Sequence, residues 1–287
     1  MTDASTARAR RWPALAILRA VALGTTLLVG PIVPAAVAAD PTPTPNPIVI
    51  TYSRSLLRAG DFVRQYTRYQ CVGASLQTMR NIISTVNNRG PNLQKKLWRI
   101  ARAHSLYKAD GGADPFGWTT ATTLSSVYGR YVLVAAETMT DAVNAAARGI
   151  ATTGHPAGII VWGGKHAWVM TGFEATADPK ATDEYRVVTI RMADPLWPYY
   201  HARGRVVYRP GMRLYMSALR RNFTAYHDSR QDPQIEGQFV AIVPIADGDP
   251  VPDGAWVPNG PASTPAPTPP PDPTPTPPPT EAPSSAP

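Results

Sequence analysis

Residues 157–173 read Ala-Gly-Ile-Ile-Val-Trp-Gly-Gly-Lys-His-Ala-Trp-Val-Met-Thr-Gly-Phe. The first and last parts of this stretch are rich in β-branched and aromatic residues, which is typical of β-strands. Between them, the Gly163-Gly164 pair predicts a turn. The stretch therefore predicts two strands, at 157–162 and 167–173, and it places His166 at the start of the second.

Two more strands are expected further along the chain, at residues 185–192 and 237–244, where β-branched and apolar residues again predominate. On the N-terminal side the hydrophobic period is different. Apolar residues recur at steps of three and four from Val72 to Val86, which predicts an amphipathic helix that begins at or just after Cys71.

Further helices are expected at residues 93–104 and 141–152, the second with Thr140 as its N-cap. Helices in the first half and strands in the second half are typical of an α+β domain. The sequence therefore predicts an N-terminal helix packed on an antiparallel β-sheet.

Cys71 is the only cysteine of the 287 residues. A cysteine reacts through its thiolate, and the N–H groups and dipole at a helix N-terminus stabilise that anion. Cys71 is therefore a candidate nucleophile, and the small residues Gly73, Ala74 and Ser75 are expected to leave room for a substrate. An inert, buried cysteine at the start of an apolar helix would have the same sequence pattern.

A nucleophilic cysteine needs a base, and the base needs an orienting partner. If the strands at 167–173 and 185–192 pair so that partner numbers sum to 360, His166 faces Asp194 and Trp168 faces Met192. A register shifted by two residues keeps the same faces but displaces this pair. The interpretation also requires an oxyanion donor, for which Gln65 and Gln70 are both candidates.

Three segments, taken in order, resemble peptidase family C-thirty-nine, which contains the bacteriocin-leader-processing peptidases and their secreted relatives. They read QYTRYQCVGAS at 65–75, GKHAWVMTGFE at 164–174 and ADP at 193–195. The resemblance covers about residues 50–244 and implies a papain-like fold.

By the same resemblance, Cys71 is the nucleophile, His166 the general base and acid, and Asp194 its orienting partner. Gln65, six positions before the cysteine, takes the oxyanion-hole role and is preferred over Gln70. Trp197 is a candidate to shield the His–Asp pair, with a core position as the alternative.

The chain departs from the family pattern directly after the cysteine. The family commonly has Gly and then Pro there, and this chain has Val72 and Gly73. The double-glycine leader specificity belongs to peptidases fused to transporter domains, so that substrate is not expected here.

The two ends of the chain differ in composition from its middle. Residues 1–39 combine arginines, a short apolar run and small residues, as a secretory signal peptide does, with a membrane anchor as the alternative. Residues 40–48 are a Pro/Thr-rich spacer and residues 246–287 a disordered Pro/Thr-rich tail. The expected domain spans residues 49–245 and is secreted or at the cell surface, with no membrane segment after cleavage.

Charge and motifs exclude several functional classes. Removing residues 1–39 leaves 24 basic and 19 acidic residues, a formal charge of +5, without the dense basic stripe of a nucleic-acid-binding protein. The histidines lack metal-ligand spacing and no phosphate-binding loop is present, so neither a metal nor a cofactor is expected.

Three functional interpretations stay open. The leading one is a cysteine peptidase that hydrolyses peptide or protein substrates through an acyl-enzyme. The second is a cell-wall amidase of the CHAP or NlpC type, since a mildly basic protein suits anionic wall polymers and Gln70 directly precedes the cysteine. The third is a non-catalytic surface-binding domain of the same fold.

Overall fold

The computed structural model of the protein describes residues 48–85, 87–107, 111–124, 127–199, 201–202, 205–227 and 234–258. The predicted signal peptide and residues 259–287 of the predicted tail lie outside the described residues. None of the helices in the described part of the chain is long and apolar enough to cross a membrane.

The main sheet has seven strands in the order β2-β9-β3-β4-β5-β8, with β1 paired to β4 beside β3, and its pairs are antiparallel. A second pair is β6-β7. The strands are β1 (Tyr52–Ser55), β2 (Arg130–Ala136), β3 (Ala157–Val161), β4 (His166–Ala175), β5 (Val187–Ala193), β6 (His201–Ala202), β7 (Arg205–Val206), β8 (Met212–Tyr215) and β9 (Phe239–Ile245).

Helices cover both faces of this sheet, so the predicted α+β class is confirmed. They are α1 (Cys71–Ser84), α2 (Pro91–Ala103), α3 (Pro115–Thr123), α4 (Met139–Thr153) and α5 (Met216–Leu219). The N-cap of α4 is Thr138, whose hydroxyl accepts a hydrogen bond from the Asp141 N–H; the predicted cap, Thr140, is wrong because the helix begins earlier.

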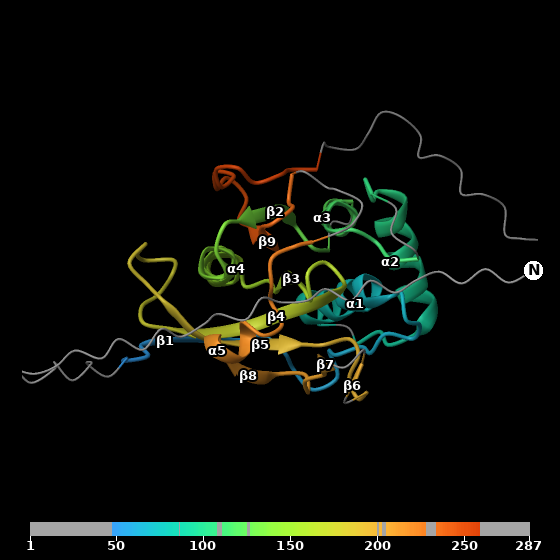
Figure 1. The fold of residues 1–287 in the computed structure, drawn as a ribbon, viewed down its shortest axis with the longest axis horizontal. Helices are drawn as coiled ribbons and strands as arrows, with labels where there is room; N and C mark the ends of the chain where they lie inside the picture. The colour runs from blue at the N-terminus through green and yellow to red at the C-terminus, as the bar shows by residue number, and fades with distance from the viewer. Residues whose placement is uncertain are drawn as a thin grey trace, which may run out of the picture. The chain divides into compact units, whose positions relative to one another are not determined.

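Two hydrophobic clusters, one on each face, hold the helices to the sheet. Trp168 and Met170 of β4 pack with α4, whereas Ala167 and Val169 of the same strand pack with α1, α2 and α3. Figure 1 shows α4 apart from those three helices, with strands between them. Because both of its faces are covered, β4 is buried along its whole length and lacks the polar alternation of a half-exposed strand.

The small residues after Cys71 serve packing. A Cβ placed on Gly73 would lie 2.8 Å from the Gln94 carbonyl oxygen and 2.8 Å from the Trp98 Cβ, so glycine lets α1 approach α2 closely. Ala74 and Ser75 are fully buried. The expectation that these residues leave room for a substrate is therefore wrong.

The register of β4 and β5 also differs from the prediction. Met170 faces Met192 and Val169 faces Ala193, a shift of two residues, and the pairing is interrupted between Met170 and Gly172 and again near Glu174. Before the interruption, a two-residue shift keeps the side chains on their expected faces, so hydrophobic pattern alone does not exclude it. After it, Phe173 rather than Gly172 packs on the same face as Trp168 and Met170, because the irregularity offsets the alternation.

The packed part of the chain extends beyond the predicted boundary at residue 245. Trp256 exchanges two backbone hydrogen bonds with Leu133 at the outer edge of β2, and its ring meets Phe116 edge-on with centroids 4.9 Å apart. Composition did not predict this extension, because Trp256 is a single aromatic residue in a segment otherwise rich in Pro, Asp and Gly.

Candidate active site

The site forms where the N-terminus of α1 meets the first residue of β4. Cys71 is the first residue of α1 and is half-buried. The preceding residue, Gln70, is the N-cap, but its side chain makes no capping hydrogen bond. Backbone hydrogen bonds from Val72 and Ala167 reach the sulfur, so both the helix and β4 contribute donors to it.

His166 is held in place from two sides. Its Nε2 lies 2.8 Å from the Oδ1 of Asp194, a hydrogen bond between two buried side chains. Its ring stacks on Trp162, with centroids 4.6 Å apart and planes inclined by 25°. Because Asp194 occupies Nε2, the Nδ1 edge of the imidazole remains for the hydrogen bond with Cys71.

Opposing effects act on the two titrating groups. Burial raises the pKa of the Cys71 thiol, but the hydrogen bond and positive charge of His166, with the two backbone donors, outweigh it and lower the pKa below its ordinary value. Burial likewise lowers the pKa of His166, but Asp194 and Cys71 outweigh that effect and raise the pKa to about 9. Each group therefore stabilises the charged form of the other, which favours a thiolate–imidazolium pair over the neutral pair in the folded protein.

Asp194 is fully buried and lies one residue beyond the end of β5. Its Oδ1 accepts hydrogen bonds from His166 and from the Leu196 N–H, at 2.8 and 2.9 Å. Its Oδ2 has no hydrogen-bond partner among the described residues. The predicted pairing of His166 with Asp194 therefore holds, although the strand register used to predict it does not. A position just past the strand end frees Asp194 from the ladder and lets it reach His166.

Gln65 lies close to this group through its backbone. Its N–H donates to the Pro195 carbonyl oxygen at 2.8 Å, which joins the extended segment before α1 to the turn after Asp194. Its side chain is buried, and Nε2 donates to the Thr67 carbonyl oxygen at 2.9 Å. A primary amide has two N–H donors, so one remains for another acceptor.

Trp162 is the residue that sequence reasoning missed. It directly precedes the Gly163-Gly164 turn, has a positive φ of 58°, and donates its indole N–H to the Asn222 side chain at 3.1 Å. Trp162 stacks on His166, and Trp197, the sequence-based candidate to shield the His–Asp pair, lines a pocket next to the turn after Asp194. The sequence feature that could have identified it is the position of an aromatic residue four places before His166, on the same predicted hairpin.

Comparisons of the chain with family models, curated proteins and solved structures found no match. Among the described residues, the structure contains no group of three or more His, Cys, Asp or Glu side chains placed to hold a metal ion.

Proposed function

We propose that this protein is an exported thiol hydrolase with a papain-like fold, which cleaves peptide or other amide bonds through Cys71, His166 and Asp194. One observation carries the proposal: a half-buried thiol at a helix N-terminus, a stacked imidazole and a buried carboxylate form one connected hydrogen-bonded series. The three residues come from α1, the start of β4 and the end of β5. An inert buried cysteine needs neither the charge partner nor the donors that lower its pKa.

In the first half of the reaction, His166 holds the proton of Cys71 as imidazolium and the thiolate attacks the substrate carbonyl carbon. The oxyanion that develops takes hydrogen bonds from backbone N–H groups at the start of α1 and from the free N–H of Gln65. The imidazolium then gives its proton to the leaving amine as the C–N bond breaks, which leaves a thioester on Cys71.

In the second half, water attacks the thioester carbonyl and gives a proton to His166. The C–S bond breaks, the carboxylic acid product leaves, and the thiolate–imidazolium pair is restored. Throughout, Asp194 holds the imidazole by Nε2 so that Nδ1 stays directed at the reacting atoms.

The decisive experiment is hydrolysis by the purified chain lacking residues 1–39, assayed on a mixed peptide library and, separately, on purified peptidoglycan. We expect new amino termini in at least one assay, and their formation should fall by more than about 10⁴-fold in Cys71→Ser. The matched control is Ser84→Ala, at the other end of α1, which should keep the full rate. Equal product formation by wild type and Cys71→Ser would sink the proposal, as would no product in either assay from a folded protein.

A further inference from the structure

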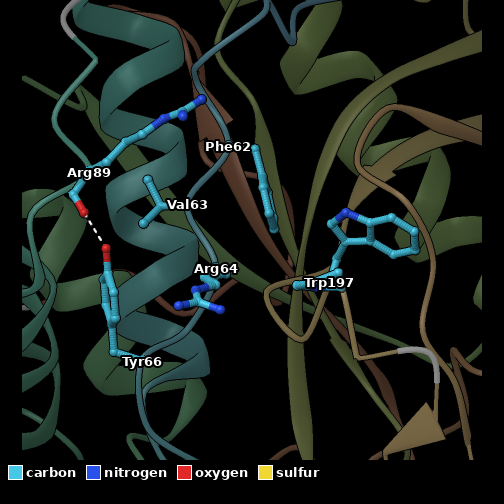
Figure 2. A pocket seen from close by; sticks show the side chains of 7 residues that line it. Phe62, Val63, Arg64, Tyr66, Arg89 and Trp197 are labelled. Carbon is cyan, nitrogen blue, oxygen red and sulfur yellow. Dashed lines mark hydrogen bonds between the residues drawn. The ribbon is translucent and has the colours of Figure 1, made fainter.

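A pocket of about 370 Å³ is lined by residues that flank Gln65 in the chain and by residues that follow Asp194. Figure 2 shows the side chains around it, which come from the extended segment before α1, from Arg89 and from the turn after Asp194. Its lining combines apolar and aromatic residues with two arginines: Phe62, Val63, Tyr66, Trp197 and Pro198, with Arg64 and Arg89.

The pocket and the proposed catalytic residues share two pieces of backbone. Gln65 sits between two pocket-lining residues, Arg64 and Tyr66, and burial alternates along this segment so that Gln65 is inside while its neighbours are exposed. The Gln65 N–H donates a hydrogen bond to the Pro195 carbonyl oxygen, which joins this segment to the turn that carries Trp197. In the same turn, the Leu196 N–H donates a hydrogen bond to Asp194 Oδ1, which connects the turn to the Asp194–His166 pair.

This connection fixes which part of a substrate faces the pocket. In the proposed mechanism, His166 protonates the leaving amine, and Asp194 holds His166. Since the turn that follows Asp194 forms one wall of the pocket, the pocket lies on the leaving-group side of the reacting bond.

The charged side chains that line the pocket are all positive. Neither Arg64 nor Arg89 makes an ion pair with any residue that the structure describes, and no lining residue is acidic. Arg89 is anchored by the bond from its Nε to the Gly60 carbonyl oxygen at 3.0 Å, and its backbone carbonyl accepts the Tyr66 hydroxyl. Arg64 lies over the Tyr66 ring, with Cζ 5.8 Å from the ring centroid. Figure 2 shows the two guanidinium groups at separate places around the pocket, so each offers its own charge-assisted contact to a carboxylate attached to an apolar or extended chain.

We infer that this pocket binds a carboxylate on the leaving-group side of the substrate, and that the hydrolase therefore prefers bonds followed by an acidic residue or by a nearby C-terminal carboxylate. The inference rests on the proposed function and names the substrate class of that same site. Each arginine is expected to contribute about fivefold to the preference at low salt, since two unit charges a few ångströms apart near water interact at that level. The preference should decline as ionic strength rises.

Cleavage-site profiling of the peptide library tests this. In the wild type, Asp and Glu should be enriched over Asn and Gln on the leaving-group side, and the enrichment should be lost in the Arg64→Gln/Arg89→Gln double variant. Arg64→Gln alone, which removes no hydrogen bond that the structure describes, should lose part of it. The charge-matched control is Arg99→Gln, on the exposed face of α2 and outside the pocket, which should keep the enrichment. An unchanged acidic preference in the double variant would overturn the inference. So would a wild type that prefers neither acidic residues nor, in the synthetic substrates below, a free C-terminus.

Synthetic substrates then separate the two sources of the carboxylate. A well-cleaved sequence is made with Glu or Gln after the reacting bond, each with a free or an amidated C-terminus. Discrimination between Glu and Gln supports an acidic side chain, and discrimination between acid and amide termini supports a terminal carboxylate. Equal cleavage rates for all four peptides count against recognition of a carboxylate by the pocket.

A binding measurement distinguishes failure of this inference from failure of the proposed function. Fluorescein-labelled Ala-Ala-Phe-Glu-Ala-amide and its Gln counterpart are titrated into Cys71→Ser, with and without Arg64→Gln and Arg89→Gln. If the Glu peptide binds more tightly than the Gln peptide, and the arginine substitutions abolish this difference, the result supports carboxylate binding in the pocket even if the wild type cleaves nothing. Equal binding of the two peptides, and of the same two peptides with a free C-terminus, refutes it even if the wild type is active.

Discussion

Two buried carboxylates, at opposite ends of the paired strands β4 and β5, have different surroundings. At one end, Glu174 accepts hydrogen bonds from the Thr189 hydroxyl at 2.9 Å and from Arg213 at 3.1 Å, with Arg191 3.7 Å away. At the other end, the Oδ1 of Asp194 accepts two hydrogen bonds and its Oδ2 has no partner among the described residues.

The difference shows what a structural and a reactive carboxylate each need. Glu174 is matched by two permanently charged guanidinium groups, so its contribution is confined to holding β5 and β8 against β4. Asp194 is matched by an imidazole, whose charge depends on pH and on the nearby thiol. We therefore expect substitutions at the Asp194 end to change reactivity and those at the Glu174 end to change stability.

Among the substitutions that test this comparison, Asp194→Asn is expected to have the largest effect. An amide in place of the carboxylate no longer stabilises the imidazolium, so the pKa of His166 should fall from about 9, and the proposed hydrolysis should fall on the order of 10³- to 10⁴-fold. Steady-state kinetics measure the rate and NMR titration of the imidazole measures the pKa. A rate within tenfold of wild type would mean that Asp194 is as structural as Glu174.

The second prediction concerns the pH dependence of the pair. The midpoint of Cys71 alkylation by iodoacetamide, which reacts with the thiolate, should lie below the ordinary cysteine pKa of about 8.5. In His166→Ala, the lowering interaction is lost while burial remains, so the alkylation midpoint should move above that value. An unchanged midpoint in the variant would show that His166 does not activate Cys71.

Hydrolysis by the wild type has a matching pH profile. The imidazolium is present below the His166 pKa, so activity should decline as the pH rises through about 9, and it should decline on the acid side as the thiolate is protonated. Between the ordinary pKa values of histidine and cysteine, about 6.5 and 8.5, the folded ion pair and the unfolded neutral pair each bind one proton. We therefore expect the pair to make stability nearly independent of pH there, which thermal unfolding across the range measures.

A smaller effect is expected at Trp162. Removing the ring in Trp162→Ala takes away the stacking contact with His166, and such contacts are worth up to about tenfold in an equilibrium, so we expect kcat/KM to fall by up to about tenfold. Trp162→Phe keeps a stacked ring and loses only the bond to Asn222, so it should retain most of the rate. Equal losses in both variants would assign the effect to the Asn222 bond.

The smallest effect on reactivity is expected for Glu174→Gln at the other end of the strands. Loss of the charge leaves Arg191 and Arg213 without their shared anionic partner, so Tm should fall by about 2 to 6 °C while the alkylation rate of Cys71 is unchanged. A changed alkylation rate would indicate that the two ends of the strands are coupled.

Local pattern determined much of what holds this molecule together. The helical period after Cys71, the β-branched runs at 157–162 and 167–173 and the Gly163-Gly164 turn each act within a few residues, and α1, β3 and β4 formed where that pattern placed them. The helix α3 was missed, although Asp114 caps it and Pro115 opens it, because its short Thr-rich sequence has no amphipathic period.

Tertiary structure alone decided the rest. Alternation with period two specifies which side chains share a face of a sheet, but it leaves the offset between β4 and β5 open by steps of two, and bulges change that offset along the pair. The contacts of Trp162 with His166, of Gln65 with Pro195 and of Trp256 with Leu133 join segments whose meeting depends on how the whole chain packs. Sequence by itself therefore determined which residues are available for chemistry, and packing decided their distances, their burial and hence their pKa values.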